Sequence, residues 1–81
     1  MRVRVLFFAG AREAAGTGSS DLELEEGATV DSARQVIAGR FPRLRERLAT
    51  VRFAVDREFA GGETLLHEGA ELAVIPPVSG G

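Results

Sequence analysis

The stretch RVRVLFF at residues 2–8 decides the fold, because its apolar and polar side chains follow a two-residue period. The odd-numbered residues Val3, Val5 and Phe7 fall on one face of an extended chain, and the two arginines fall on the other face with Leu6 and Phe8. This alternation predicts a β-strand inside a sheet, with one face turned to a core.

Two segments after this strand complete a hairpin. Residues 10–16 hold good helix formers between two glycines, which predicts one or two helical turns. Residues 21–25 alternate again, with Leu22 and Leu24 between acidic side chains, and this predicts a half-buried strand at a sheet edge. We therefore expect a hairpin with a short helix inserted between its strands.

The main helix is expected to begin after Thr29, whose hydroxyl can cap it. A single apolar stripe along this helix is expected from Val30, Ala33, Val36 and Ile37. Pro42 disfavours helical geometry at Phe41, so the helix should end near Arg40 and let Phe41 fold back onto the core. A short turn is expected over residues 43–49.

Two further apolar segments predict later strands. Residues 51–56 alternate with Val51, Phe53 and Val55 on one face, and residues 72–75 are continuously apolar. A glycine-punctuated, loop-rich connection separates them. The order strand, strand, helix, strand and at least one more strand predicts an α+β fold, a mixed sheet with one main helix across a face. We expect one domain over residues 1–75 and a flexible C-terminal tail over residues 76–81.

Composition excludes several kinds of chemistry. The chain has 81 residues, a formal net charge of −2 and no Cys, so it has neither a disulfide framework nor a thiolate nucleophile. All ten basic residues are Arg, so no side-chain amine can form a Schiff base or accept an isopeptide bond. His67 is the single His and has no neighbouring ligand pattern, so no metal site is predicted. We expect a cytoplasmic protein that neither enters a membrane nor binds nucleic acid.

An arginine cluster stands out in the middle of the chain. Its members are Arg34, Arg40, Arg43, Arg45 and Arg47. Glu46 interrupts the cluster, and no aromatic residue is placed among the arginines to stack on bases. Two interpretations remain: a solvated helix face, or a surface that docks an acidic protein.

The segment PPVSGG at residues 76–81 is the strongest candidate for function. Pro76 and Pro77 favour extended geometry, so the tail should leave the sheet in a defined direction. An extended tail spans about 16 Å from Pro76 to Gly81, far enough to enter another protein's active site. Because glycine has no Cβ, the last two residues would fit a narrow channel.

The chemistry available to such a tail is that of the Gly81 carboxylate. A carboxylate is a poor electrophile until it is activated, typically by adenylation, and an acyl adenylate can then accept sulfur to become a nucleophilic thiocarboxylate. Many chains also end in glycine-rich residues without a function. Spacing alone leaves both interpretations open.

Four short motifs resemble one family over essentially the whole chain. They are VLFFA at residues 5–9, ARE at 11–13, GT at 16–17 and IPPVSGG at 75–81. Together they resemble the small subunits of molybdopterin synthase, within the MoaD/ThiS family of ubiquitin-like sulfur carriers. The resemblance implies a ubiquitin-like β-grasp fold. Asp56 departs from the family's pattern, in which Asn is frequent, but both residues tolerate tight turns.

The resemblance also implies the function. Gly81 would be adenylated by a MoeB-like activating enzyme that uses ATP, and the chain itself would bind no cofactor. The resulting thiocarboxylate would donate sulfur to a pterin precursor in molybdenum cofactor biosynthesis, inside a MoaE-like large subunit. The synthase would be a heterotetramer, and the chain would not be catalytic alone. The residues expected to enter the partner are Pro76, Pro77, Val78, Ser79 and Gly80.

Two alternatives share this activation chemistry. One is a ubiquitin-like modifier whose terminus forms isopeptide bonds with other proteins, and the other is a sulfur carrier for thiamine or for tRNA thiolation. The partner-facing surface is harder to locate from sequence. Exposed apolar residues near the tail, Phe8 or Phe59, are candidates for the edge of a docking patch.

Overall fold

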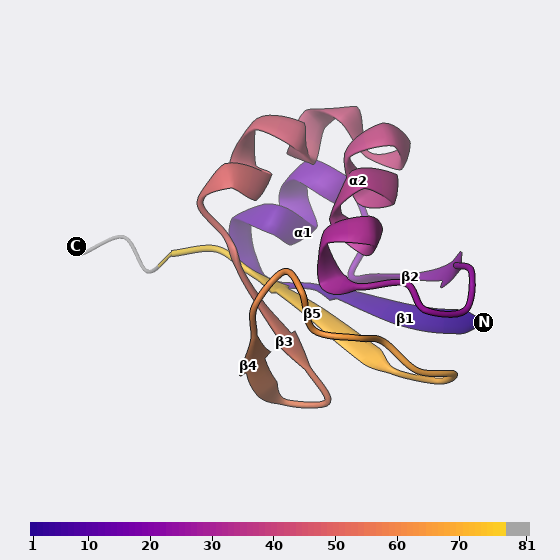
Figure 1. Ribbon diagram of the computed structural model, residues 1–81. Helices are drawn as coiled ribbons and strands as arrows, with labels where there is room; N and C mark the ends of the chain where they lie inside the picture. The colour runs from indigo at the N-terminus through magenta and orange to yellow at the C-terminus, as the bar shows by residue number, and fades with distance from the viewer. Residues whose placement is uncertain (78–81) are drawn as a thin grey trace.

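The computed structural model describes residues 1–77. Its elements are β1 (Arg2–Phe7), α1 (Ala9–Ala15), β2 (Ser19–Glu23), α2 (Val30–Arg40), the 3₁₀ segment η1 (Pro42–Ala49), β3 (Arg52–Val55), β4 (Glu58–Ala60) and β5 (Glu71–Ile75). The strands form one sheet in the order β2-β1-β5-β3-β4. The three helical segments lie on one face of this sheet, and the other face is open (Figure 1).

The first two strands form the expected hairpin with α1 inserted between them. They pair antiparallel, with Val3 opposite Leu22. Val3, Val5 and Phe7 are buried and the intervening side chains are less so, which confirms the predicted faces of β1. α1 ends at Gly16, which takes a left-handed φ of 78° and donates its backbone N–H to the Arg12 carbonyl. β2 lies at the sheet edge as predicted, but it begins and ends two residues earlier than the sequence pattern indicated.

Helix α2 begins where the sequence predicted. The Thr29 hydroxyl accepts the Ser32 backbone N–H at 3.2 Å, and the Ser32 hydroxyl accepts the Thr29 backbone N–H at 3.1 Å, a reciprocal capping box. Val30, Ala33 and Ile37 are buried beneath the helix. The prediction for Val36 was wrong, because this side chain is 38% exposed. The helix rests on the sheet along a narrower stripe than its apolar residues indicated.

The turn after α2 closes the core. α2 ends at Arg40, and Phe41 folds back so that its ring meets that of Phe7 edge to face, with centroids 5.0 Å apart. Segment η1 then buries Leu44 and Leu48. Both predictions for this region, the helix end and the return of Phe41, are confirmed.

Strand β4 is the element that the sequence pattern missed. It pairs antiparallel with β3 across a tight turn at Asp56 and Arg57, whose φ angles are 50° and 74°. Asp tolerates this left-handed geometry because its short side chain can bond nearby backbone. With three residues, β4 is too short to show a periodicity.

Strand β5 lies at the centre of the sheet. It runs parallel to β1 and antiparallel to β3. Leu72 and Val74 are fully buried beneath the helical layer. The mixed sheet with one main helix across its face confirms the α+β, β-grasp arrangement.

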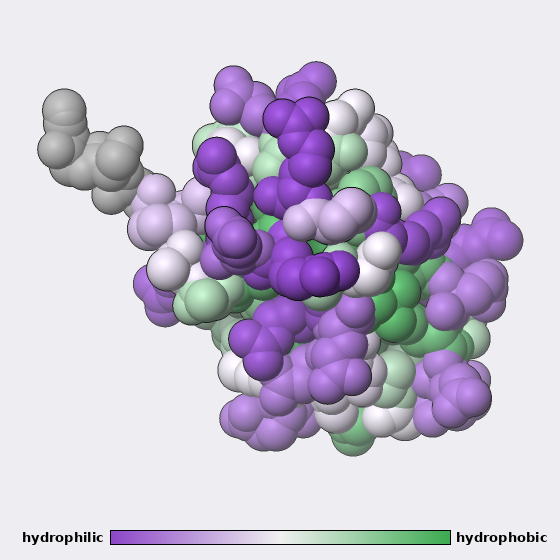
Figure 2. Space-filling view, turned by 90° about the horizontal axis from the view of Figure 1, so that it is seen from above, coloured by the Kyte–Doolittle hydropathy of each residue, from purple (hydrophilic) through white to green (hydrophobic). Residues whose placement is uncertain are grey.

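The helical layer presents a polar outer surface (Figure 2). Arg43, Arg45 and Arg47 are exposed along η1, and no described carboxylate lies within ion-pair distance of them. Arg34 instead pairs with Asp31 at 3.3 Å. Arg40 donates to the Asp21 carbonyl of the edge strand β2 at 3.2 Å. The expected cluster is therefore a surface of separate side chains, two of which have structural partners.

Substitutions at two neighbouring positions of α2, Val36 and Ile37, test which face of the helix packs on the sheet. Ile37→Ala should lower the free energy of unfolding by about 2–5 kcal/mol, because Ile37 is fully buried and its truncation leaves a cavity. Val36→Ala should change it by less than about 1 kcal/mol, because Val36 is partly solvated. Urea unfolding followed by circular dichroism measures both, and equal losses would contradict the assigned helix face.

Candidate functional site

The predicted tail starts at the middle of the sheet. β5 ends at Ile75, and Pro76 and Pro77 continue the chain outside any helix or strand. Pro76 is half-buried and Pro77 is exposed. The other predicted site residues, Val78, Ser79, Gly80 and Gly81, lie outside the residues that the structure describes.

Two elements flank the point where the tail departs. The Phe8 backbone N–H donates to the Val74 carbonyl at 3.2 Å, so the end of β1 lies beside the end of β5. On the other side, Arg52 at the start of β3 is opposite Ile75. The sheet thus holds the root of the tail by strands on both sides.

An apolar hollow occupies the open sheet face next to this root. It has a volume of about 460 Å³ and is lined by Leu6, Phe8, Ala54, Arg57, Phe59, Glu71, Ala73 and Ile75. The strand register aligns four of its residues in one row across the sheet: Leu6, Ala73, Ala54 and Phe59. Small alanines at the centre and larger side chains at the sides give the face its concave shape.

The two phenylalanines named from the sequence both line this hollow. Phe8 is 46% exposed and Phe59 is 62% exposed, so neither belongs to the core. The structure therefore brings together residues that are 51 positions apart. Sequence reasoning missed Leu6, Ala73 and Ile75 as neighbours, although the even-numbered face of residues 2–8 already placed Leu6 with Phe8.

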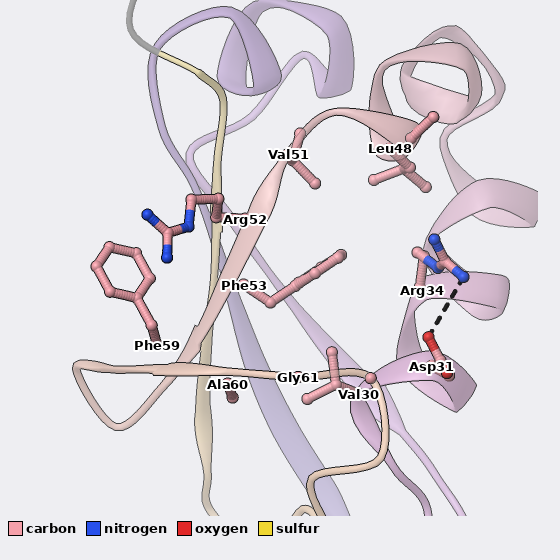
Figure 3. A pocket seen from close by; sticks show the side chains of 12 residues that line it. Val30, Asp31, Arg34, Leu48, Val51, Arg52, Phe53, Phe59, Ala60 and Gly61 are labelled. Carbon is pink, nitrogen blue, oxygen red and sulfur yellow. Dashed lines mark ion pairs between the residues drawn. The ribbon is translucent and has the colours of Figure 1, made fainter.

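The guanidinium of Arg52 stacks on Phe59, with its Cζ atom 4.1 Å from the ring centroid. Figure 3 shows that Arg52 points toward Phe59 and away from the Phe53 ring, which turns to the helical side of β3. One strand thus supplies the core with Phe53 and the open face with Arg52.

The opposite end of the open face is charged and internally paired. Arg2 lies 3.4 Å from Glu23, and Arg4 lies 3.5 Å from Asp21, between β1 and β2. These exposed pairs contribute little to stability. They nevertheless neutralise this end of the face, whereas the end nearest the tail combines apolar side chains with Arg52.

Asp56 ties the β3–β4 turn to β5. Its backbone N–H donates to the Glu71 carbonyl at 2.9 Å, and its Oδ1 accepts the Glu71 N–H at 3.0 Å. Its Oδ2 lies 2.6 Å from His67 Nε2, and His67 Nδ1 lies 3.0 Å from the Glu68 carbonyl. Both ring nitrogens therefore face acceptors, which favours the imidazolium form.

These contacts shift two pKa values in opposite directions. The hydrogen bond to Asp56, followed by that to the Glu68 carbonyl, raises the pKa of His67 above its ordinary 6.5. The hydrogen bond from His67, followed by that from the Glu71 N–H, lowers the pKa of Asp56 below its ordinary 3.8. His67 is an exposed loop residue, and its role here is to hold a turn.

A second hollow, of about 480 Å³, opens between α2, η1, β3 and β4 (Figure 3). Leu48, Val51 and Phe53 contribute apolar side chains, and the Asp31–Arg34 pair lies at its rim. The Asp31 carboxylate is already paired with the Arg34 guanidinium. This pair therefore offers no free acid or base for catalysis.

Neither of two other kinds of site occurs in the described part of the chain. Residues 1–77 contain no group of three His, Cys, Asp or Glu side chains placed to hold a metal ion. Within the same residues, none of the helices has the length and apolar character needed to cross a membrane.

Comparison with known proteins gives consistent matches. The model of the ThiS family matches residues 5–81. The molybdopterin synthase sulfur carrier subunit of Chlamydomonas reinhardtii is 40% identical over 84 residues, covering 100% of both chains. A putative molybdopterin converting factor, subunit 1, from Pyrococcus furiosus superposes with a TM-score of 0.89 at 30% identity, covering 96% of this chain and 99% of the other. The small archaeal modifier protein 1 of Haloferax volcanii superposes with a TM-score of 0.93 at 28% identity, covering 100% of both.

The Asp56–His67 contact has a defined pH dependence. Because the folded pKa of His67 is raised, its contribution to stability is complete below 6.5 and is lost as pH rises through the folded value. Because the folded pKa of Asp56 is lowered, its contribution is present above 3.8 and is lost as pH falls through the folded value. The contact therefore stabilises most between these two pH values.

Asp56→Asn tests this contact while keeping a residue that tolerates positive φ. We expect the pKa of His67 to fall toward 6.5 in the variant, as measured by NMR titration of the single imidazole. The stability lost in the variant should be larger at about pH 5.5 than at about pH 8.5. An unchanged pKa of His67 would show that Asp56 does not control it.

Proposed function

This chain belongs to the ThiS family, and from that premise we propose that it is the sulfur carrier subunit of a molybdopterin synthase, with Gly81 as the residue that carries the sulfur. One observation carries the proposal, the end-to-end similarity to a sulfur carrier subunit of that synthase. The double glycine at residues 80 and 81 supplies the position for the chemistry.

The proposed reaction begins at the Gly81 carboxylate. An activating enzyme joins it to AMP from ATP and releases pyrophosphate, which converts a poor leaving group into a good one. Hydrosulfide, or a persulfide with a reductant, then displaces AMP and leaves a thiocarboxylate. Attack of that sulfur on a carbon of the pterin precursor displaces an oxygen substituent of that carbon, which leaves as water. Hydrolysis of the resulting thioester then leaves a thiol on the pterin and returns the carboxylate. Because the activation consumes ATP, we propose the cytoplasm as its location.

The fold supports this role by the place at which the described chain leaves the sheet. Pro76 and Pro77 leave the centre of a sheet, and the hollow beside them is apolar and concave. We propose that the large subunit of the synthase docks on this hollow and receives residues 76–81 in its active site. Exposed aromatic side chains are common anchors in such interfaces. The adenylating enzyme is the other proposed partner, and two small and two large subunits form the proposed heterotetramer.

A second candidate function is protein modification. The superposition on a protein called a modifier favours it, and the same activated carboxylate would acylate a lysine of another protein. The chain has no Lys, so it would not form lysine-linked chains on itself. A carrier for thiamine or tRNA sulfur would differ from the first proposal only in its recipient.

Intact-mass spectrometry distinguishes these functions. After incubation with the activating enzyme, ATP and a sulfur donor, we expect a gain of about 16 Da, one oxygen exchanged for sulfur at Gly81. Adding the large subunit and the pterin precursor should reverse the gain. No gain with an activating enzyme that is active on another carrier would contradict sulfur carriage, and lysine conjugates in place of pterin product would favour modification.

A chain extended by one alanine after Gly81 is the matched control. It should gain no sulfur at Gly81, because the activated carboxylate has moved, while its thermal unfolding should stay almost unchanged. Full sulfur transfer by an extended chain whose mass shows no trimming would contradict the assignment of Gly81.

Phe59→Ser tests the docking surface. Loss of an exposed aromatic anchor should weaken binding to the large subunit by about tenfold or more, with little change in the free energy of unfolding. Leu65→Ser is the control, because Leu65 is 66% exposed and lies outside the lining of the hollow. Equal binding by both variants in calorimetry would place the interface elsewhere.

A further inference from the structure

The arginines of the open face differ in whether they have an ion-pair partner. At the charged end, Arg2 and Arg4 each lie within ion-pair distance of a carboxylate. No carboxylate among residues 1–77 lies within that distance of Arg52, beside the root of the tail, or of Arg57, in the β3–β4 turn. The apolar part of the face is therefore bordered, on the β3–β4 side, by two arginines without ion-pair partners in the described chain.

Arg52 differs from an ordinary solvated arginine because it is held in place. Its guanidinium lies over the Phe59 ring at 4.1 Å from the centroid, and stacking on an aromatic face leaves the N–H groups at the guanidinium edge free to bind. Those groups match the two oxygens of a carboxylate. Holding the side chain in advance reduces the conformational entropy that is lost on binding.

The position of Arg52 connects it to the tail. Its Cα is paired with that of Ile75, the last residue of β5, so Arg52 lies one residue before the tail begins. A group bound there would be fixed relative to the start of residues 76–81. Arg57 and Glu71 line the hollow farther from this point.

We propose that Arg52, stacked on Phe59, is a positioning residue that binds a carboxylate of the large subunit at the entrance of the channel that receives the tail. This inference rests on the proposed docking of that subunit. Charge complementarity and the apolar hollow together define the occupant, a protein surface with an apolar centre and an acidic residue on the side that meets β3. A polyphosphate or nucleic acid is disfavoured, because the hollow is mostly apolar, its lining includes the Glu71 carboxylate, and the chain has a net charge of −2.

Two charge reversals separate this contact from general electrostatics. Arg52→Glu and Arg43→Glu make the same change in net charge, and both positions are exposed, but Arg43 lies on η1 of the helical layer. In calorimetric titration with the large subunit, Arg52→Glu should raise Kd by about 30-fold or more, and Arg43→Glu by about twofold or less. Arg52→Lys should raise Kd by about fivefold, because it keeps the charge and loses the planar pair of donors.

Sulfur transfer from preformed thiocarboxylate gives the second readout. Arg52→Glu should raise KM for the carrier and leave kcat almost unchanged, because Arg52 positions the tail and does not touch the reacting atoms. Thermal unfolding should show that each variant is folded. Equal effects at both positions, or wild-type affinity with Arg52→Glu, would overturn the inference while leaving the carrier function intact. Failure of the wild-type chain to bind the large subunit or to transfer sulfur would instead overturn the proposed function.

Discussion

The structure depends on the pairing of β5 with two neighbours at once. This strand is the last in the chain, yet it lies between β1 and β3, so the segments at both ends of the sequence must come together before the sheet is complete. A parallel pair such as β1–β5 needs a long connection, and α2 with η1 lies within it on a single face of the sheet. The same pairing brings the root of the tail beside Phe8 and Arg52. The position at which Pro76 and Pro77 leave the sheet thus follows from the hydrogen bonding of its strands.

The two faces of the sheet differ in the side chains that they carry. On the helical side, Val3, Val5, Leu72 and Val74 are fully buried, and the described part of the chain buries no polar or charged side chain. Such an interior provides stability and has no groups for catalysis. The open face instead combines an apolar hollow with a charged end. This division agrees with the proposed role of a subunit that supplies a substrate to another active site.

Much of this architecture could be predicted, for reasons that lie in particular residues. The strict alternation of residues 2–8 identified both faces of β1, and Thr29 and Pro42 marked the ends of α2 because capping and proline act locally. Val36 was assigned wrongly, since an apolar residue does not reveal how wide a stripe the sheet will cover. The hollow could not be predicted, because it depends on the register of four strands, of which only β3 and β4 are close in sequence. The prediction for Gly81 rests on a motif and lies outside the described residues, whereas the contacts of Arg52 with Phe59 and of His67 with Asp56 required the fold.

The central place of β5 also determines how the domain bears a mechanical load. A force applied to the chain at Ile75 along the strand axis acts across the hydrogen bonds to β1 and β3. They are therefore loaded together in shear and cannot be peeled apart one after another, as they would be at a sheet edge. A pull on Pro76 and Pro77 is consequently spread over both neighbouring strands, so β5 resists being drawn out of the sheet from its C-terminal end.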